Sequence, residues 1–513
     1  MKKQTIIAII FSAFVILAVN SPLIYFYLFP KNGMEFLGRG HINSQDVYTY
    51  VSFIEQAKRG AAVFQNLYTT EPQKPSLIRP SYFIIWQAAK ITGVSSIAAY
   101  HVARIILSII FCFALYRFLK HFFDKENELT TTFAMVLTAS GLGFAVANFL
   151  PDSIDLWIPE AVTFLSLFEA PHFILSQILL LSGYIFFLEY LKNKSAQDLI
   201  LLGLMFFALS FEHPFNLVTV VPTLSLTYFF SRKKLDPALL LAGVAAIGLV
   251  IQVILTITNP TLLSWQAQNN LPPPAPSAFL IGYGLITLLA LVGIEEKMRE
   301  GLYPQIKLLL TWIAVTFVLV FSPINFSRRL LEGVHVPIAI LASIGLSATL
   351  IKFGKDSRKA VAFIIICVLS LSSVYAIFKN FEVINQDVKD NYYYHITKEE
   401  AKAIEWLGEN SAPNDIILST RFFGNLIPGI AARKVFAGHL IQTTNFHGKI
   451  NEINSFVQST DKNSAQIFLA KNKINYLFFG INDQMLQGNF DPKSLAFLSL
   501  VYDRDGVQIF KVK

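Results

Sequence analysis

Asp46 combines a residue type and a position that could do chemistry. It stands in the run Asn43-Ser44-Gln45-Asp46-Val47-Tyr48, at the start of a stretch with helical spacing of apolar residues. An ionised carboxylate that faces water can act as a general base and take a proton from a hydroxyl group. An acid in the first turn of a helix also offsets the positive end of the helix dipole, so a purely structural role stays open.

Arg328 and Arg329 form a pair of guanidinium groups at the expected outer end of an apolar stretch. Two adjacent cations there need an anionic partner, and phosphate fits best because a guanidinium group binds its oxygens in a two-pronged geometry. The alternative is an internal ion pair with Glu332 or Glu169, because charged side chains near membrane helices often pair with each other. Both interpretations hold if a ligand displaces the internal partner.

Acids and histidines occur together at two more boundaries of apolar stretches, as Glu169 with His172 and Glu212 with His213. A metal site needs ligands at a defined spacing, which these separate loops do not have. We therefore favour a hydrogen-bond network at the helix ends over a metal site. We expect no cofactor; a divalent cation is possible but not indicated.

Further polar residues expected on the same side are Glu332, Trp265 and Gln268, the last two just before a proline cluster. His439 follows a short apolar run near the C-terminal end and receives no role. The chain has no phosphate-binding loop of the Walker type, no Gly-x-Ser-x-Gly and no His-Glu-x-x-His. Nucleotide-driven pumps, hydrolases with a nucleophile elbow and zincin proteases are therefore not expected.

The composition indicates a membrane framework for these groups. Of the 513 residues, 54% are hydrophobic and only 15% are charged, and the mean hydropathy is +0.51. Because soluble domains carry about 25% charged residues, a soluble protein is excluded. The net charge of +8 fits basic cytoplasmic loops, so nucleic acid is not an expected partner.

About eleven apolar runs are long enough to cross a bilayer, which takes about 20 residues. They begin near Ile6, Ile97, Leu129, Pro171, Ala196, Pro214, Pro237, Ser277, Leu302, Leu331 and Val361. The loops on one side are basic, as at Lys297 to Arg299, whereas loops on the other side, such as Pro151 to Ala170, contain no lysine or arginine. The positive-inside rule then predicts a multi-pass protein of the plasma (inner) membrane with a cytoplasmic N-terminus.

The first outer loop, at about residues 30–96, has a helical pattern of its own. Val47, Tyr50, Val51 and Ile54 follow the spacing i, i+3, i+4, i+7. This spacing predicts an amphipathic helix that lies along the outer membrane interface.

A small α/β domain is expected at the C-terminal end. Thr397-Lys398-Glu399-Glu400 is a capping box that opens a helix. Five apolar runs after it predict strands, and the last two are joined by a hairpin at Asp505-Gly506. We therefore predict a membrane part over residues 1–380 and an extracytoplasmic α/β domain over 381–513. The predicted strands span residues 415–419, 435–437, 476–479, 500–502 and 507–512.

Taken with this layout, several short motifs resemble the GT-C superfamily of polyprenyl-phosphate-sugar-dependent glycosyltransferases, especially bacterial members with a C-terminal extracytoplasmic domain. The matching pieces are Asp46 to Tyr50 with Gln56-Ala57 and Gly60, Pro171-His172-Phe173, His213-Pro214-Phe215, Arg328 to Gly333, Ala403 to Leu407 and Gly438-His439. No chemistry is attached to the two C-terminal pieces.

The resemblance implies an enzyme, an inverting glycosyltransferase that moves a hexose from a polyprenyl-phosphate donor to a hydroxyl group of a glycan, lipid or protein acceptor on the extracytoplasmic face. It implies that Asp46 is the catalytic base and that Arg328 and Arg329 hold the donor phosphate. Supporting residues would be Glu169, His172, His213, Glu332, Trp265 and Gln268. The chain has Val47 where many relatives carry a second acid.

Two alternatives belong to other classes of protein. A transporter or a flippase of lipid-linked glycans would place the same charges along a translocation path, but such a path needs ionisable groups near mid-membrane, and here they lie near helix ends. A non-catalytic scaffold would use its outer domain to bind glycan or protein. Asp46 would then only open a helix.

Overall fold

The computed structural model describes residues 3–232, 236–386, 393–459, 461–481, 483 and 490–513. The chain divides into two compact units. The first unit comprises the N-terminal residues up to Pro22, His101–Ile254 and Asn270–Glu382, and the second comprises Leu23–Tyr100, Leu255–Asn269 and the chain from Val383 onward. These are units of packing, and the predicted boundary near residue 380 stays a prediction.

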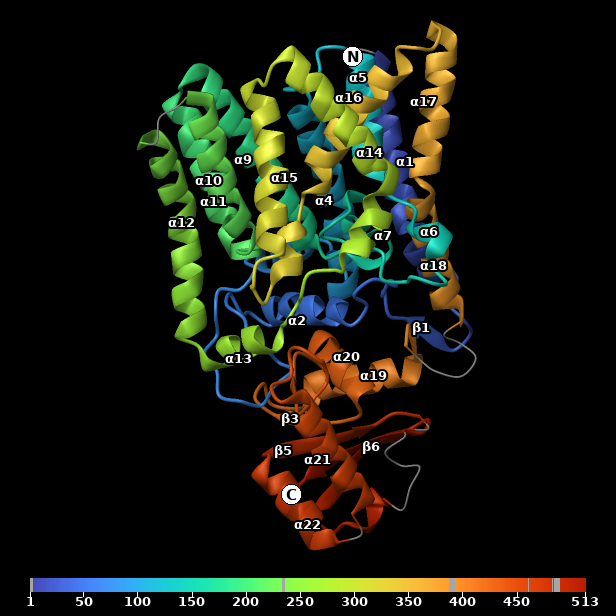
Figure 1. The fold of residues 1–513 in the computed structure, drawn as a ribbon. Helices are drawn as coiled ribbons and strands as arrows, with labels where there is room; N and C mark the ends of the chain where they lie inside the picture. The colour runs from blue at the N-terminus through green and yellow to red at the C-terminus, as the bar shows by residue number, and fades with distance from the viewer. Residues whose placement is uncertain (1–2, 233–235, 387–392, 460, 482, 484–489) are drawn as a thin grey trace. The chain divides into compact units, whose positions relative to one another are not determined.

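Long helices make up most of the first unit (Figure 1). A helix occupies each of the eleven apolar runs expected from the sequence. In chain order the helices are α1 (Lys3–Leu28), α4 (Ser96–Leu119), α5 (Glu126–Thr138), α6 (Gly143–Val146), α7 (Ile154–Trp157), α8 (Thr163–Ser166), α9 (Pro171–Asn193), α10 (Ala196–Glu212), α11 (Asn216–Arg232), α12 (Asp236–Ile257), α14 (Pro276–Glu300), α15 (Pro304–Val320), the 3₁₀ helix η1 (Ser327–Leu331), α16 (His335–Leu350), α17 (Lys355–Leu369) and α18 (Leu371–Gln386).

Several of these helices have the length and surface of membrane spans. In the described part of the chain, 5 stretches are long and apolar enough to cross a membrane, or 7 if each of two bent helix pairs is one span. Large apolar side chains on them are exposed, such as Phe14 on α1 and Leu280 on α14, as expected where lipid is the solvent. The chain is therefore a multi-pass membrane protein, whereas the number eleven and the orientation of the termini stay predictions.

Glycines let two of these helices meet backbone to backbone. A Cβ atom on Gly293 of α14 would lie 2.0 Å from the carbonyl oxygen of Leu341, and one on Gly345 of α16 would lie 1.9 Å from that of Leu289. Small residues at such positions let membrane helices approach closely and gain van der Waals contact. The pair α14 and α16 therefore depends on these two glycines.

The second unit contains shorter helices and both sheets. Its helices are α2 (Asp46–Lys58), α3 (Ser81–Ala89), α13 (Pro260–Gln268), α19 (Lys398–Asn410), α20 (Arg421–Ala431), α21 (Phe446–Gln458), α22 (Lys462–Lys471) and the 3₁₀ helix η3 (Pro492–Ser494). Its strands are β1 (Met34–Phe36), β2 (His395–Thr397), β3 (Ile416–Leu418), β4 (Lys434–Val435), β5 (Ile474–Phe479), β6 (Leu498–Arg504) and β7 (Val507–Val512).

The main sheet has the strand order β4-β3-β5-β7-β6. Strands β4, β3 and β5 are parallel, and β7 and β6 continue the sheet antiparallel. Asp505 and Gly506 join β6 to β7 with φ values of 51° and 85°, the left-handed conformation that a tight hairpin turn requires. The capping box at the start of α19 is present, with Thr397 accepting from the Glu400 amide and Glu400 accepting from the Thr397 amide. The α/β fold predicted for this part of the chain is confirmed.

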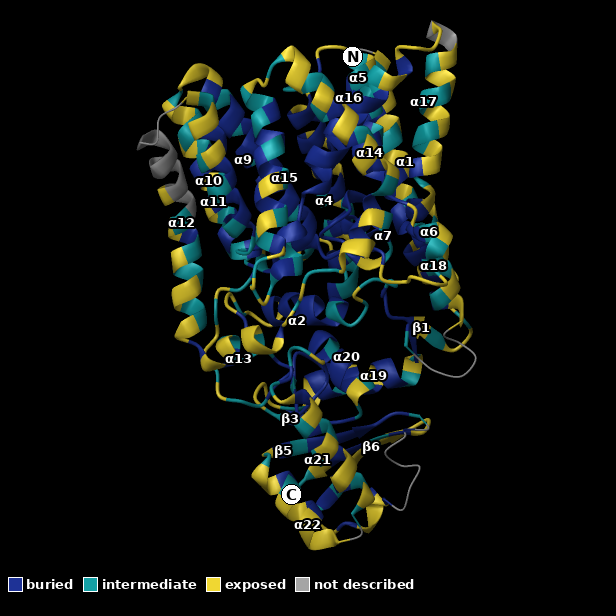
Figure 2. Cartoon of the chain, viewed as in Figure 1, coloured by how far each residue is buried: buried dark blue, intermediate teal, exposed yellow. Residues whose placement is uncertain are grey.

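Helix α2 is buried along its length rather than on one face. Every residue from Val47 to Ala57 is buried, and α2 and α20 are largely dark blue in Figure 2. The two helices pack closely because α20 has a glycine at the contact: a Cβ atom on Gly429 would lie 2.6 Å from Cδ1 of Tyr48. Asp46, the first residue of α2, is therefore held in place by a helix that is itself tightly packed. The location of α2 at the membrane interface stays a prediction.

Candidate functional site

Asp46 is the first residue of α2, as its sequence context predicted. Its amide donates to the carbonyl oxygen of Asn43 at 2.9 Å, and Asn43 has a φ of 46°, so the chain turns tightly just before the helix. The Asp46 side chain keeps 37% of its surface exposed, in contrast to the buried residues that follow it. A carboxylate in this position is held by a buried helix and is still reachable from outside.

The partner of this carboxylate is His439, which lies 393 residues further along the chain. Nε2 of His439 is 2.7 Å from Oδ1 of Asp46, and the histidine side chain is only 3% exposed. Nδ1 of His439 accepts hydrogen bonds from the amides of Ile441 and Gln442, each at 3.2 Å. Because backbone amides can only donate, Nδ1 carries no hydrogen, and Nε2 is the nitrogen that donates to Asp46. His439 is therefore a donor that orients the carboxylate, not a second base.

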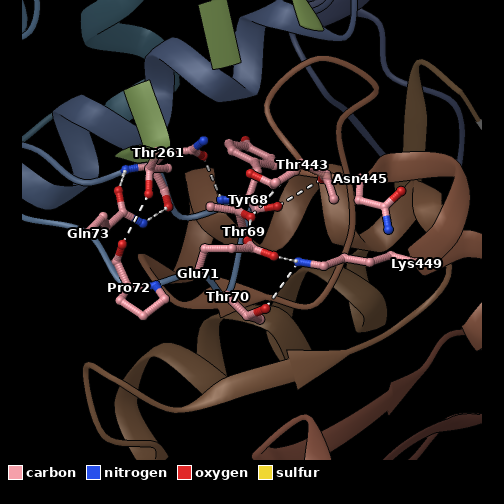
Figure 3. Close-up of polar contacts among 12 residues, drawn as sticks. Tyr68, Thr69, Thr70, Glu71, Pro72, Gln73, Thr261, Thr443, Asn445 and Lys449 are labelled. Atoms are coloured by element: carbon pink, nitrogen blue, oxygen red, sulfur yellow. Dashed lines mark hydrogen bonds and ion pairs between the residues drawn. The ribbon is translucent and has the colours of Figure 1, made fainter. Parts of the chain in front are cut away.

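Thr443 holds the loop that carries His439. Its hydroxyl oxygen accepts from the amides of Gly438 at 3.1 Å and His439 at 3.2 Å, and it donates to the carbonyl oxygen of Tyr68 at 2.8 Å. Figure 3 shows this contact between the segment at Tyr68 and the loop at Thr443. One hydroxyl group therefore fixes the loop 438–445 both internally and to the segment at Tyr68.

Gln268 holds the same loop, and Lys449 holds helix α21, which follows it. Nζ of Lys449 lies 2.8 Å from Oε1 of Glu71 and 3.1 Å from the hydroxyl of Thr70 (Figure 3). The Gln268 amide donates to the carbonyl oxygens of Ile441 and Thr443 at 3.1 Å each. Gln268, expected as a supporting residue, thus contacts the backbone of the loop that carries His439.

Helix α20 fixes the chain just before Asp46. The side-chain amide of Asn425 donates to the Gln45 carbonyl oxygen at 3.2 Å, and Arg421 donates to the Gln45 side chain at 3.1 Å. Asn425 in turn accepts from the buried guanidinium of Arg39. Burial lowers the pKa of Arg39 below its ordinary value, with smaller opposing effects from nearby tyrosines. The start of α2 is thus held by a buried polar network.

The arginine pair lies in the first unit, within η1. Arg328 has its Nη2 3.8 Å from Oε1 of Glu160 and its guanidinium carbon 5.1 Å from the ring centre of Trp157. Its Nε atom is buried and meets no acceptor in the described residues. Arg329 lies 5.2 Å from the ring centre of Phe215. Among the residues that the structure describes, the carboxylate paired with Arg328 is therefore Glu160, rather than the Glu332 or Glu169 considered from the sequence.

Glu332 instead belongs to a buried cluster with His213. Nδ1 of His213 lies against one carboxylate oxygen of Glu332, and the hydroxyl of Ser176 donates to the other. The rings of His172 and His213 are 6.0 Å apart, centre to centre. Three of the predicted supporting residues thus lie together in the first unit. Glu169, a fourth predicted supporting residue, is buried in the loop just before α9.

Trp265, the remaining predicted supporting residue, lies in α13 of the second unit. Its ring centre is 5.9 Å from the guanidinium carbon of Arg79. Within the described residues it belongs to a different cluster from Asp46 and His439. No group of three or more metal-ligating side chains occurs within the described ranges.

His439 is the main residue that sequence reasoning left without a role. A signal existed, because Gly438-His439 was among the motifs that resembled the GT-C enzymes. Its partner could not be found from spacing, since the contact joins α2 to a loop near the other end of the chain.

No family model and no curated protein matches this sequence. Solved structures do match. The archaeal oligosaccharyltransferase AglB from Archaeoglobus fulgidus, in complex with an inhibitory peptide and a dolichol-phosphate, is 14% identical, with a TM-score of 0.57 over 93% of this chain and 69% of that chain. The Archaeoglobus fulgidus oligosaccharyltransferase tethered to an acceptor peptide is 13% identical, with a TM-score of 0.53 over 93% and 69% of the two chains.

A further match is ArnT from Cupriavidus metallidurans bound to undecaprenyl phosphate, which is 13% identical with a TM-score of 0.49 over 97% of this chain and 98% of that chain. At such identities it is the fold that is shared. The chain therefore has the fold seen in these two oligosaccharyltransferase structures, the GT-C fold that its layout and short motifs predicted.

Proposed function

We propose that this protein is a membrane glycosyltransferase that moves a sugar from a polyprenyl-phosphate donor to an acceptor hydroxyl group outside the cytoplasm. The observation that carries the proposal is the pair of Asp46 and His439, with Nε2 of the histidine 2.7 Å from the carboxylate. A carboxylate that is oriented by a buried donor and keeps part of its surface exposed is suited to a general base. The GT-C fold adds support, because it is the fold of enzymes that transfer glycans.

Asp46 has the role of base in this proposal, and His439 positions it. The acceptor hydroxyl gives its proton to Asp46 while its oxygen attacks the anomeric carbon of the sugar. The bond from that carbon to the phosphate oxygen breaks, and the electron pair leaves with the polyprenyl phosphate. One displacement of this kind inverts the anomeric configuration. The proposed reaction includes no cofactor, because phosphate is already a good leaving group, and a divalent cation is not indicated.

Arg328 and Arg329 have the role of binding the donor phosphate, an assignment argued within the first unit. Arg328 has one carboxylate at 3.8 Å and a buried Nε that meets no acceptor in the described residues. Such a guanidinium can exchange a long ion pair for charge-assisted bonds to phosphate, which stabilise the charge that develops on the leaving group. The solved structure of AglB contains a dolichol-phosphate, which is consistent with a lipid-phosphate donor.

The other predicted supporting residues act indirectly, by holding the residues around them in place. Glu332, His213 and His172 are buried in the first unit with Ser176, and Glu169 lies in the same unit. Gln268 holds the loop of His439. We propose membrane lipid as the surrounding partner and a glycan, lipid or protein as the acceptor.

The test is sugar transfer by the full-length protein in liposomes, with a panel of polyprenyl-phosphate sugars. Asp46→Asn keeps the size of the side chain and removes the base, so we expect turnover to fall by roughly 100-fold or more while donor binding persists. Arg328→Ala with Arg329→Ala should weaken donor binding, each lost charge-assisted bond costing about tenfold. Asp124, an exposed acid, serves as the matched control through Asp124→Asn.

Each outcome decides a specific assignment. Full turnover in Asp46→Asn would remove Asp46 as the base. Unchanged donor binding in the arginine variant would remove the phosphate assignment and leave the base intact. If the native protein transfers no sugar from any donor but moves lipid-linked glycans across the liposome membrane, the protein is a flippase and the transferase proposal is wrong.

A further inference from the structure

Arg79 is a buried cation in the second unit that the proposed reaction does not use. It is 6% exposed and lies in the first outer segment just before α3. Its backbone has a φ of 48°, a left-handed conformation that is unfavourable for a residue other than glycine. The fold therefore holds a charged side chain in a costly backbone conformation and away from water.

Aromatic rings lie close to the Arg79 guanidinium group. Its guanidinium carbon lies 5.1 Å from the ring centre of Tyr50 and 5.9 Å from that of Trp265. Tyr50 is itself stacked on Tyr82 at 5.7 Å. Rings stabilise the positive charge through their faces, but they offer no lone pairs to N–H groups. No carboxylate among the described residues is paired with this arginine.

Three N–H groups in this cluster point to a missing acceptor. Nε and Nη1 of Arg79 are buried and donate to nothing in the described residues, and the same holds for Nε1 of Trp265. A buried donor without an acceptor is costly, and more so when it carries charge. All three groups are donors, so a ligand in this cluster must present acceptors to them.

A phosphate group matches the donors on one side of this cluster. The edge of an arginine formed by Nε and Nη2 binds two oxygens of one anion, and phosphate has a further oxygen outside their plane that can accept from Nε1 of Trp265. A carboxylate also binds this edge, but its remaining lone pairs lie in the plane of the fork. We propose that Arg79 and Trp265 form a phosphate-binding site in the second unit. The inference stands apart from the transfer reaction, because it needs neither Asp46 nor the arginine pair.

The phosphate can belong to a lipid headgroup or to a free anion. Calorimetric titration can separate these sources with the full-length protein in a phosphate-free maltoside detergent. One arm uses inorganic phosphate and the other uses a short-chain prenyl phosphate. Both titrations are repeated with the Arg328→Ala/Arg329→Ala variant. Binding that persists there cannot come from the proposed donor-phosphate site, so the two phosphate sites are tested independently.

Three variants test the site. Arg79→Lys keeps the charge and loses the fork, and we expect binding at this site to weaken by about tenfold or more. Trp265→Phe keeps a ring and removes the N–H donor, and should weaken binding by a smaller factor of about three to ten. Lys90→Gln removes an exposed cation from the same segment and should leave both affinities unchanged.

The melting temperature separates a ligand site from a structural role. Arg79→Met removes an unsatisfied buried charge, so without phosphate it should melt at or above the native temperature, and it should lose the rise that phosphate gives the native protein. Weakening in only one titration arm identifies that arm's ligand as the source. Unchanged affinity of both ligands in Arg79→Lys, or a lower melting temperature of Arg79→Met with the phosphate response retained, would overturn the proposal.

Discussion

The two nitrogens of His439 do different things, and two substitutions can separate them. Nδ1 accepts from the amides of Ile441 and Gln442, and Nε2 donates to Asp46. In His439→Asn the side-chain oxygen reaches about as far as Nδ1, so the loop keeps an acceptor while Asp46 loses its donor. In His439→Gln the amide nitrogen reaches about as far as Nε2, so Asp46 keeps a donor while the loop loses its acceptor.

The expected sizes follow from the bonds that each variant loses. A hydrogen bond to a charged group is worth about 1.5–3 kcal/mol, so His439→Asn should lower kcat by roughly 10- to 150-fold. KM should change little, because the carboxylate acts in the chemical step. His439→Gln leaves two backbone amides of a buried loop without their acceptor, and we expect a stability loss of about 1–3 kcal/mol. Its kcat should stay near the native value.

The assay is sugar transfer in liposomes at several acceptor concentrations, with thermal unfolding measured on the same preparations. A positioning role requires the two variants to diverge, one losing rate and the other losing stability. If His439→Asn transfers sugar as fast as the native protein, the contact with Asp46 has no part in catalysis. If both variants lose rate and stability together, His439 acts only through the loop.

Three further perturbations test the framework of the second unit. Gly429→Ala would place a Cβ atom 2.6 Å from Cδ1 of Tyr48, and we expect the forced separation of the two helices to cost about 1–3 kcal/mol in thermal unfolding. Glu71→Gln removes the partner of the buried Lys449 ammonium at 2.8 Å, which should destabilise the protein by about 1–3 kcal/mol in denaturant unfolding. Hydrogen bonds at the start of α22, the largest from a serine hydroxyl, hold the pKa of Asp461 below its ordinary value of 3.8. Its contribution to stability is therefore present above pH 3.8 and lost as pH falls through the lower native pKa, so Asp461→Asn should flatten the acid limb of the unfolding profile.

Each of these three predictions has a control or an outcome that would contradict it. Gly354→Ala, where no atom lies within 4 Å of the new Cβ, should leave stability unchanged, and an equal loss at both glycines would contradict the packing argument. Glu71→Gln combined with Lys449→Met should be less destabilised than Glu71→Gln alone, since no unpaired buried charge remains. An unchanged acid limb in Asp461→Asn would show that this carboxylate does not contribute to acid unfolding.

Local patterns were enough to predict much of this fold. Apolar runs of about 20 residues indicate membrane helices because lipid requires every backbone group to be paired within the helix. The capping box at Thr397 and the hairpin at Asp505-Gly506 depend on neighbouring residues only, and both are present. Asp46 begins its helix as predicted. These features are encoded within a few residues of one another, so the sequence determines them by itself.

Tertiary structure decided which groups meet. His439 reaches Asp46 across 393 positions, and Trp265 reaches Arg79 from another segment. Glu332 lies against His213, although Arg329 is only three positions before it in the sequence. Such contacts follow from how helices and loops pack over long separations, and no local periodicity carries that information. The sequence by itself therefore determined the elements and the residue types available for chemistry, and the packing determined the partners that give each residue a role.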